Sequence, residues 1–193
     1  MSLYRVGRVI CRMFFKSLYR YEASGRHNVP EDGAVILCSN HISTLDPPFV
    51  GTPLNRKVHF MAKAELFNIP VFGRLIASLG AFPVKRGGVS KESIRHALQL
   101  LGEGGVLGIF PEGTRGGGGM GKKGAASLAL RSGATVIPVA IIGEYKPFRK
   151  MKIVYGEPVD LSRIREESNS DSLEQATEHI MASIRRLKEA HTR

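Results

Sequence analysis

A histidine and an aspartate five residues apart form the first group in this sequence that is suited to acid–base chemistry. His41 and Asp46 lie in the segment 40–47, which reads Asn-His-Ile-Ser-Thr-Leu-Asp-Pro and directly follows an apolar run. Pro47 disfavours helical geometry at Asp46 and so favours a turn. A turn can bring the carboxylate to the imidazole, fix its tautomer and make it a base for a hydroxyl proton. The alternative is that Asp46 caps a helix entered at Pro47 and that His41 is an ordinary loop histidine.

Two further polar clusters follow predicted strands. Residues 110–115 read Phe-Pro-Glu-Gly-Thr-Arg, and residues 82–88 read Phe-Pro-Val-Lys-Arg-Gly-Gly. Ligand-binding groups in α/β folds gather at the carboxyl ends of strands. Arginine suits a phosphate, and glycine lets backbone N–H groups approach it. The alternative in both cases is a solvated polar turn.

Other chemistries have weaker support in the sequence. Residues 116–123 nearly fit the nucleotide-binding P-loop pattern, but Lys123 stands where that loop needs a hydroxyl. The five histidines other than His41 have no ligand-like spacing, so we expect no metal site. Cys11 and Cys38 have no metal-ligand spacing, and two cysteines cannot form a disulfide framework that holds a fold together. This favours a reducing, cytoplasmic setting in which both are ordinary thiols.

Strands alternating with helices must position these clusters. Apolar, β-branched runs predict strands over 34–38, 58–62, 81–84, 106–110, 135–142 and 152–155, and Pro138 favours an edge or a bulge in the fifth. Helical spacing predicts helices over 48–54, 64–79 with a break at Pro70, 90–101, 123–131 and 172–190. This alternation predicts an α/β fold with a mainly parallel sheet flanked by helices.

The 193 residues suffice for a single domain, which we expect over 23–193, after a separate amphipathic helix over 1–22. One face of that helix is basic and the opposite face is apolar. A helix lying in a membrane interface has this pattern, and so does a helix packed on its own core with a solvated basic face. We expect neither a membrane-spanning segment nor a signal peptide, because cations interrupt the apolar residues. The basic face holds Arg5, Arg8, Arg12, Lys16 and Arg20, and the apolar face holds Leu3, Val6, Ile10, Met13, Phe14 and Leu18.

The chain is strongly basic, with 28 Lys and Arg against 17 Asp and Glu and a formal net charge of +11. Residues 1–150 carry a surplus of twelve positive charges, because the last 43 residues have seven basic and eight acidic side chains. Such a surplus favours an anionic partner: a nucleic acid, a phospholipid surface or a phosphorylated substrate.

The order of the clusters resembles the four-block pattern of the glycerolipid acyltransferase family, and within it the bacterial 1-acyl-glycerol-3-phosphate (lysophosphatidate) acyltransferases. The blocks are Asn40-His41-x4-Asp46, the stretch 82–86, the stretch 110–115 and Val-Ile-Pro-Val-Ala over 136–140. Residues 61–67, Met-Ala-Lys-Ala-Glu-Leu-Phe, also look like that family. The resemblance runs from about residue 24 to 160.

The resemblance implies a role for each motif residue. His41 would be the general base for the acceptor hydroxyl, and Asp46 would orient and charge-stabilise it. Pro138 and its neighbours would be structural and near the acyl chain. The glycerophosphate head would be held by Arg86, Glu112 and Arg115, with Gly113 and Thr114 shaping that loop and Lys63 adding a cation.

The resemblance also implies the substrates and the place of action. The acyl donor would be acyl-CoA or acyl-carrier protein, used as a co-substrate without a resident cofactor. The acceptor would be lysophosphatidate at an anionic membrane, with the protein peripheral on its cytoplasmic side. Three alternatives remain open: another lyso-lipid acceptor such as a lyso-ornithine lipid, a thioesterase, and a nucleic-acid-binding module. We expect no nucleic-acid partner, because the sequence has no recognition motif and few interleaved aromatic residues.

Overall fold

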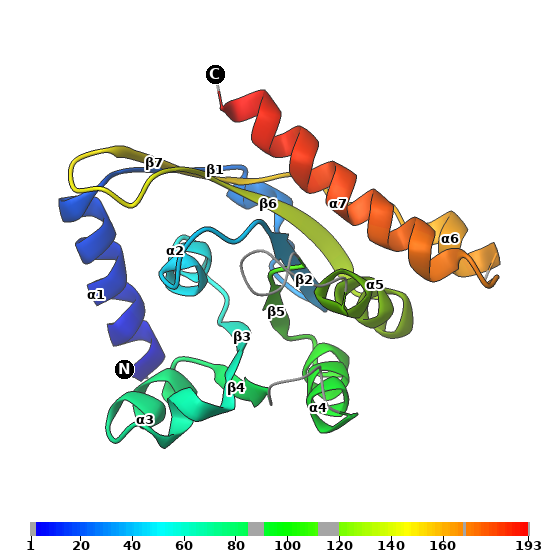
Figure 1. The fold of residues 1–193 in the computed structure, drawn as a ribbon, viewed down its shortest axis with the longest axis horizontal. Coiled ribbons are helices and arrows are strands. Elements are labelled where there is room, and N and C mark those ends of the chain that lie inside the picture. Colours follow the sequence, from blue (N-terminus) through cyan, green and yellow to red (C-terminus); the bar gives the residue numbers. More distant parts are fainter. Residues whose placement is uncertain (1–2, 85–90, 112–119, 168, 193) are drawn as a thin grey trace.

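One sheet organises the chain (Figure 1). The structure, a computed structural model, describes residues 3–84, 91–111, 120–167 and 169–192. Within them the sheet has seven strands in the order β1-β7-β6-β2-β5-β3-β4. Every neighbouring pair is parallel except β6 and β7. The strands are β1 Arg20–Ser24, β2 Val35–Ser39, β3 Val58–Lys63, β4 Ala81–Val84, β5 Val106–Ile109, β6 Thr135–Gly143 and β7 Lys150–Tyr155.

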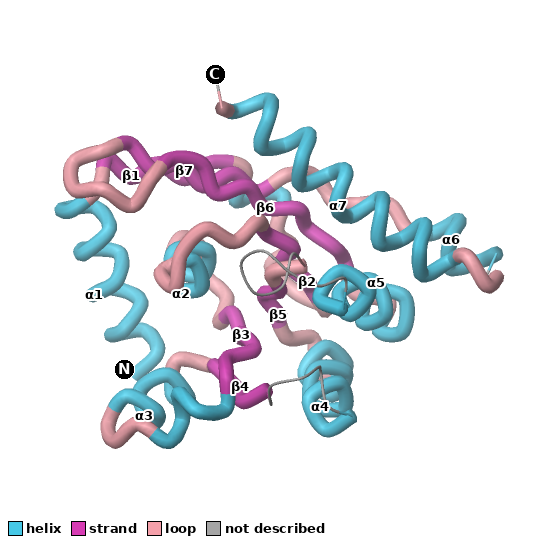
Figure 2. Tube along the Cα trace, in the orientation of Figure 1, coloured by secondary structure: helices cyan, strands magenta, loops and turns pink. Residues whose placement is uncertain are grey.

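Helices cover both faces of the sheet (Figures 1 and 2). One face is covered by α4, α5, α6 and α7, and the other by α1 and α2. The α-helices are α1 Leu3–Leu18, α2 Asp46–Gly51, α3 Phe72–Ser78, α4 Lys91–Gly102, α5 Met120–Ser132, α6 Ser162–Glu167 and α7 Ser172–His191; short 3₁₀ turns are η1 Arg26–Asn28 and η2 Ala64–Asn68. The expected α/β fold with a mainly parallel sheet flanked by helices is therefore confirmed.

The central strand β2 shows why the core has two halves. Successive side chains of a strand point to opposite faces. Ile36 and Cys38 accordingly pack with α4, α5 and α7, whereas Val35 and Leu37 pack with α1 and α2. All four side chains are fully buried. Burial raises the pKa of the Cys38 thiol to about 12, so this cysteine is an inert core residue.

The prediction of an edge at Pro138 is wrong, because β6 lies inside the sheet between β7 and β2. The alternative of a bulge fits the pairing, since two residues of β6 face three of the partner segment between the pair Val139–Tyr155 and the bridge Val136–Val159. The position tolerates proline because the ladder with β7 ends there. The last register pair joins Val139 to Tyr155, and the next contact is a hydrogen bond from Gly156 N–H to the Pro138 carbonyl, 2.8 Å long.

The expected break at Pro70 is confirmed, since η2 ends at Asn68 and α3 begins at Phe72. The expected turn is present at Thr44 and Leu45, but the prediction that Asp46 itself is not helical is wrong. The helix α2 begins at Asp46 and carries Pro47 and Pro48 in its first turn, where a missing N–H has no helical partner to lose. The short strand β1, which we did not expect, pairs in parallel with β7 and begins at Arg20.

The first helix has three stripes rather than two. An inner stripe around Phe15, which is 1% exposed, packs against α2 and β1 in the same core as β2. An apolar stripe stays exposed and includes Ile10 and Met13. A basic stripe lies between them, except that Arg8 turns inward and donates to the carbonyls of Leu54 and Asn55. The structure therefore combines packing on the core with the exposed apolar face that a membrane contact needs.

Among residues 3–84, 91–111, 120–167 and 169–192, no helix has the length and apolar character needed to cross a bilayer.

Candidate active site

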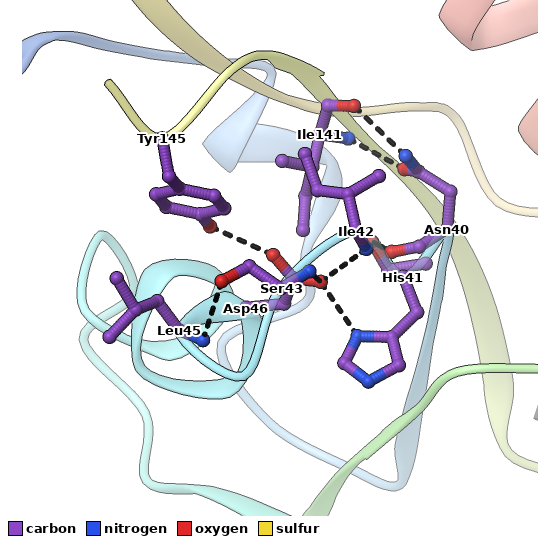
Figure 3. A network of polar contacts seen from close by, with 9 residues as sticks. Asn40, His41, Ile42, Ser43, Leu45, Asp46, Ile141 and Tyr145 are labelled. Carbon is purple, nitrogen blue, oxygen red and sulfur yellow. Dashed lines mark hydrogen bonds and ion pairs between the residues drawn. The ribbon is translucent and has the colours of Figure 1, made fainter. Parts of the chain in front are cut away.

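A buried carboxylate organises the loop after β2 (Figure 3). Asp46 is 0% exposed, and its Oδ2 atom accepts three hydrogen bonds. The donors are the backbone N–H groups of Ile42, at 2.6 Å, and Ser43, at 2.8 Å, together with Nδ1 of His41 at 2.6 Å. The loop thus folds around the first residue of α2 instead of pointing the two side chains apart.

These contacts fix the tautomer of His41. A carboxylate is an acceptor only, so the proton of the neutral ring lies on Nδ1 and Nε2 has a free lone pair. The His41 side chain is 20% exposed, while its partner is fully buried. On one side the ring stacks on Phe110, with centroids 4.4 Å apart. The geometry presents Nε2 as a base that can take a proton from a bound hydroxyl.

Asn40 anchors this loop to the sheet. Its side chain is 4% exposed and makes two hydrogen bonds to the backbone of Ile141 in β6. The amide nitrogen donates to the Ile141 carbonyl at 2.9 Å, and the amide oxygen accepts from the Ile141 N–H at 2.7 Å. The residue before His41 is thereby fixed on the neighbouring strand.

Tyr145 is a functional residue that the sequence did not reveal. Its hydroxyl donates to Oδ1 of Asp46 at 2.8 Å, so both carboxylate oxygens have donors (Figure 3). Burial, and then the neighbouring negative charge of Asp46, raise the pKa of Tyr145, which keeps the hydroxyl protonated as a donor. Nothing in the sequence around residue 145 links it to a residue 99 positions earlier.

The other predicted site residues stand differently to this pair. Lys63 is exposed at the carboxyl end of β3, where its register partner is Val84 of β4. Because β2, β3, β4 and β5 are parallel, these strand ends share the edge at which His41 lies. The remaining predicted residues lie outside the described part of the chain: Arg86, Glu112, Gly113, Thr114 and Arg115.

Comparisons with known proteins agree with this geometry. A family model described as Acyltransferase matches residues 20–142. The chain is 31% identical over 170 residues to the 1-acyl-sn-glycerol-3-phosphate acyltransferase of Bacillus subtilis (strain 168), covering 84% of this chain and 85% of that protein. It is 32% identical over 123 residues to the protein of the same name from Borreliella burgdorferi, covering 61% of this chain and 49% of that one.

The fold also has a counterpart among solved structures. The crystal structure of the 1-acyl-sn-glycerophosphate (LPA) acyltransferase PlsC from Thermotoga maritima superposes with a TM-score of 0.72 at 25% sequence identity. The match covers 95% of this chain and 79% of that one. Most of this chain therefore shares the architecture of that enzyme.

Proposed function

This chain belongs to the acyltransferase family, and we propose that it moves a fatty acyl group from a thioester to the free hydroxyl of 1-acyl-glycerol-3-phosphate, giving phosphatidic acid. The observation that carries the proposal is the His41–Asp46 pair: a partly exposed imidazole held by a buried carboxylate at the carboxyl end of a parallel strand. That pair activates a hydroxyl, and the acceptor is an alcohol.

The proposed chemistry needs no nucleophile from the protein. Nε2 of His41 takes the proton as the acceptor oxygen attacks the thioester carbonyl, and a tetrahedral intermediate forms. The intermediate collapses as the carbon–sulfur bond breaks, and the thiolate recovers the proton from the imidazolium. Asp46 stabilises the imidazolium in between. Base catalysis of this kind contributes typically about 10²–10⁴-fold in rate.

The phosphate of the acceptor needs cations, and the family resemblance gives that role to Arg86 and Arg115. The proposed headgroup site also includes Glu112, the loop residues Gly113 and Thr114, and Lys63 at the end of β3. Guanidinium groups bind phosphate through paired N–H donors. The thioester would come as acyl-CoA or on acyl-carrier protein, as a co-substrate.

The acceptor is a lipid, so we include a peripheral membrane contact in the proposal, on the cytoplasmic side. The support is the outer surface of α1, where an exposed apolar stripe lies beside the exposed cations Arg5, Arg12 and Lys16. An interfacial helix buries its apolar face among acyl chains while its cations meet anionic headgroups. Each such cation contributes about 1 kcal/mol near an anionic surface.

The experiment is a transfer assay with purified protein, lysophosphatidate and either acyl-CoA or acyl-carrier protein. We expect phosphatidate to form, and His41→Ala to lower kcat by at least about 100-fold. His179→Ala, which changes an exposed histidine on α7, is the matched control and should keep full activity.

Two outcomes would contradict the proposal. Release of free fatty acid at a rate that does not depend on the acceptor would indicate a thioesterase. Faster transfer to a lyso-lipid without a phosphomonoester, such as a lyso-ornithine lipid, would indicate a different acceptor. The arginine assignment has its own test: Arg86→Ala and Arg115→Ala should raise the KM for lysophosphatidate and not the KM for the thioester.

A further inference from the structure

The two most exposed large apolar side chains in the described part of the protein share an unusual backbone conformation. Val71 is 80% exposed and Phe148 is 74% exposed. Their φ angles are +65° and +63°, and within the described residues only these two non-glycine residues have positive φ. An exposed apolar side chain does not contribute the free energy of burial to stability. A positive φ angle adds backbone strain at any residue other than glycine. Two residues that combine both features point to a function at these positions.

A rigid turn presents Val71. With φ 65° and ψ −53°, Val71 is the centre of a γ-turn of the strained type, closed by a 2.7 Å hydrogen bond from Phe72 N–H to the Pro70 carbonyl. The turn is braced from behind, because the Gly73 N–H donates to the Ile69 carbonyl at 2.8 Å. The apolar neighbours of Val71 are also exposed, at 47% for Ile69 and 43% each for Phe72 and Leu75.

Both exposed positions flank α1. The Phe148 N–H donates to the Leu18 carbonyl at 2.8 Å, which places the loop 144–149 against the carboxyl-terminal end of the helix. Near the other end, Gly7 approaches Leu79 so closely that a Cβ on the glycine would lie 2.5 Å from the leucine side chain. Figures 1 and 2 show α3 beside the N-terminal half of α1 and the β6–β7 loop beside its other end.

The elements that carry the exposed apolar side chains therefore lie along one edge of the molecule (Figure 1). Twelve large apolar side chains are exposed among the described residues, and all except Ile42 belong to α1, to the stretch 69–75 or to the loop 144–149. Exposed cations accompany each part: Arg5, Arg12 and Lys16 on α1, Arg74 beside the Val71 turn and Arg149 beside Phe148. Exposed apolar side chains with cations beside them fit an anionic lipid surface. The apolar side chains can insert among the lipids, and the anionic headgroups attract the cations.

We propose that the Val71 turn and the Phe148 loop insert into an anionic bilayer on either side of α1, so that three contacts hold the protein on the membrane. The inference rests on the membrane contact of the proposed function and adds two insertion points to it. A single interfacial helix is a narrow line of contact, so it resists tilting of the protein about the helix axis less than a broader contact does. Two further contacts away from that axis fix the orientation of the sheet edge that carries His41.

The test uses fluorescence, because the chain contains no tryptophan. Single substitutions Val71→Trp and Phe148→Trp each place one reporter at a proposed insertion point, Met13→Trp reports on the apolar stripe of α1, and His179→Trp on α7 is the control. Each protein is mixed with vesicles of phosphatidylglycerol and phosphatidylcholine whose acyl chains carry bromine, with no thioester or acceptor present. We expect a blue shift and at least twofold quenching at 71, 148 and 13, and no change at 179.

The outcomes separate this inference from the proposed function. Quenching at 13 without quenching at 71 and 148 would show that α1 binds alone, and would overturn the three-point contact only. No quenching at any site would overturn it together with the proposed membrane contact, while the transfer assay in detergent would still decide the chemistry. A blue shift at 71 without lipid, with a doubled mass in light scattering, would identify a second copy as the occupant and overturn the inference.

The strained backbone at Val71 gives a second test. Val71→Gly removes the side chain and suits the positive φ, so the variant should unfold at a higher urea concentration than wild type. It should nevertheless bind anionic vesicles about tenfold more weakly, the fold-change that corresponds to losing about 1.4 kcal/mol of apolar burial. Unchanged vesicle binding by both Val71→Gly and Phe148→Gly would overturn the inference.

Discussion

Replacing Tyr145 with phenylalanine removes one oxygen atom, and with it one of the hydrogen bonds that hold Asp46. The hydroxyl donates to Oδ1 at 2.8 Å. The ring packs edge-on against Tyr19 and Phe49, with centroids 5.6 Å away in each case. Phenylalanine keeps these ring contacts, so the substitution isolates the contribution of the hydroxyl.

The structure sets the size of the expected effect. Asp46 is fully buried, so Oδ1 gains no water when the hydroxyl is lost. A hydrogen bond to a charged group contributes about 1.5–3 kcal/mol, and we expect the free energy of unfolding to fall by that amount. Oδ2 keeps its three donors, so the carboxylate loosens without leaving the site. We therefore expect kcat to fall by about tenfold or less, with both KM values unchanged.

The separation of kcat from KM distinguishes a positioning role from simple loss of stability. A loosened Asp46 positions the base less well, which lowers kcat and leaves both KM values unchanged. A variant that is merely less stable, assayed below its unfolding temperature, should keep the wild-type kcat.

The assays are urea unfolding and initial rates of acyl transfer with both substrates varied. Tyr19→Phe is the matched control, since its ring belongs to the same cluster and its hydroxyl has no hydrogen-bond partner among the described residues. If Tyr145→Phe matched wild type within about 0.5 kcal/mol in stability and showed the same kcat, the hydroxyl would not be holding Asp46.

Three further predictions concern other parts of the structure. Burial raises the pKa of Tyr21 from 10.0 to about 12, so the unfolded chain loses this proton first, and the contribution of Tyr21 to the free energy of unfolding, which is complete below pH 10, should be lost between pH 10 and 12. Burial also raises the pKa of Tyr4, Tyr145 and Tyr155, so the comparison is with Tyr21→Phe: a difference in urea midpoint between wild type and this variant that does not change from pH 8 to 12 would contradict the prediction. Asn40→Ala leaves the N–H and carbonyl of Ile141 without their side-chain partners and should cost about 2–4 kcal/mol of stability in urea unfolding, whereas a loss below about 1 kcal/mol would show that water replaces the amide. Arg56→Lys should cost about 1–2 kcal/mol in the same measurement, because one ammonium cannot replace a guanidinium that donates to three loop carbonyls, and an unchanged midpoint would refute that reading.

The elements that could be predicted from the sequence are those with strong local patterns. The apolar run before His41 predicts β2, and the helical spacing of 172–190 predicts α7. β1 escaped prediction because Arg20 continues the basic spacing of the helix, although its position is decided by pairing with β7. Pro138 led to the wrong prediction that its strand lies at the edge of the sheet. The order of the strands depends on pairing between distant segments, and no local sequence pattern contains that information.

The site divides in the same way. His41 and Asp46 are close in sequence, so their contact could be predicted from the segment itself, although Asp46 is the first residue of α2 and not part of the turn that Pro47 was taken to favour. The sequence places Asn40 in the same motif but does not predict its partner, because its hydrogen bond to Ile141 spans 101 residues. Tyr145 meets Asp46 only through the folded sheet. Interactions that join distant segments depend on the register of the strands and had no signal in a single sequence.

A chain of aromatic contacts ties the N-terminal helix to the site. Phe15 of α1 packs edge-on against Phe49, with ring centroids 5.1 Å apart. Phe49 packs in the same way on Tyr145, which donates to Asp46. Removing the first twenty residues would therefore open the core beside the carboxylate. A variant that removes the proposed membrane contact should instead keep α1 and change only its outward stripe, for instance with Ile10→Gln and Met13→Gln, because the inner stripe around Phe15 then stays packed.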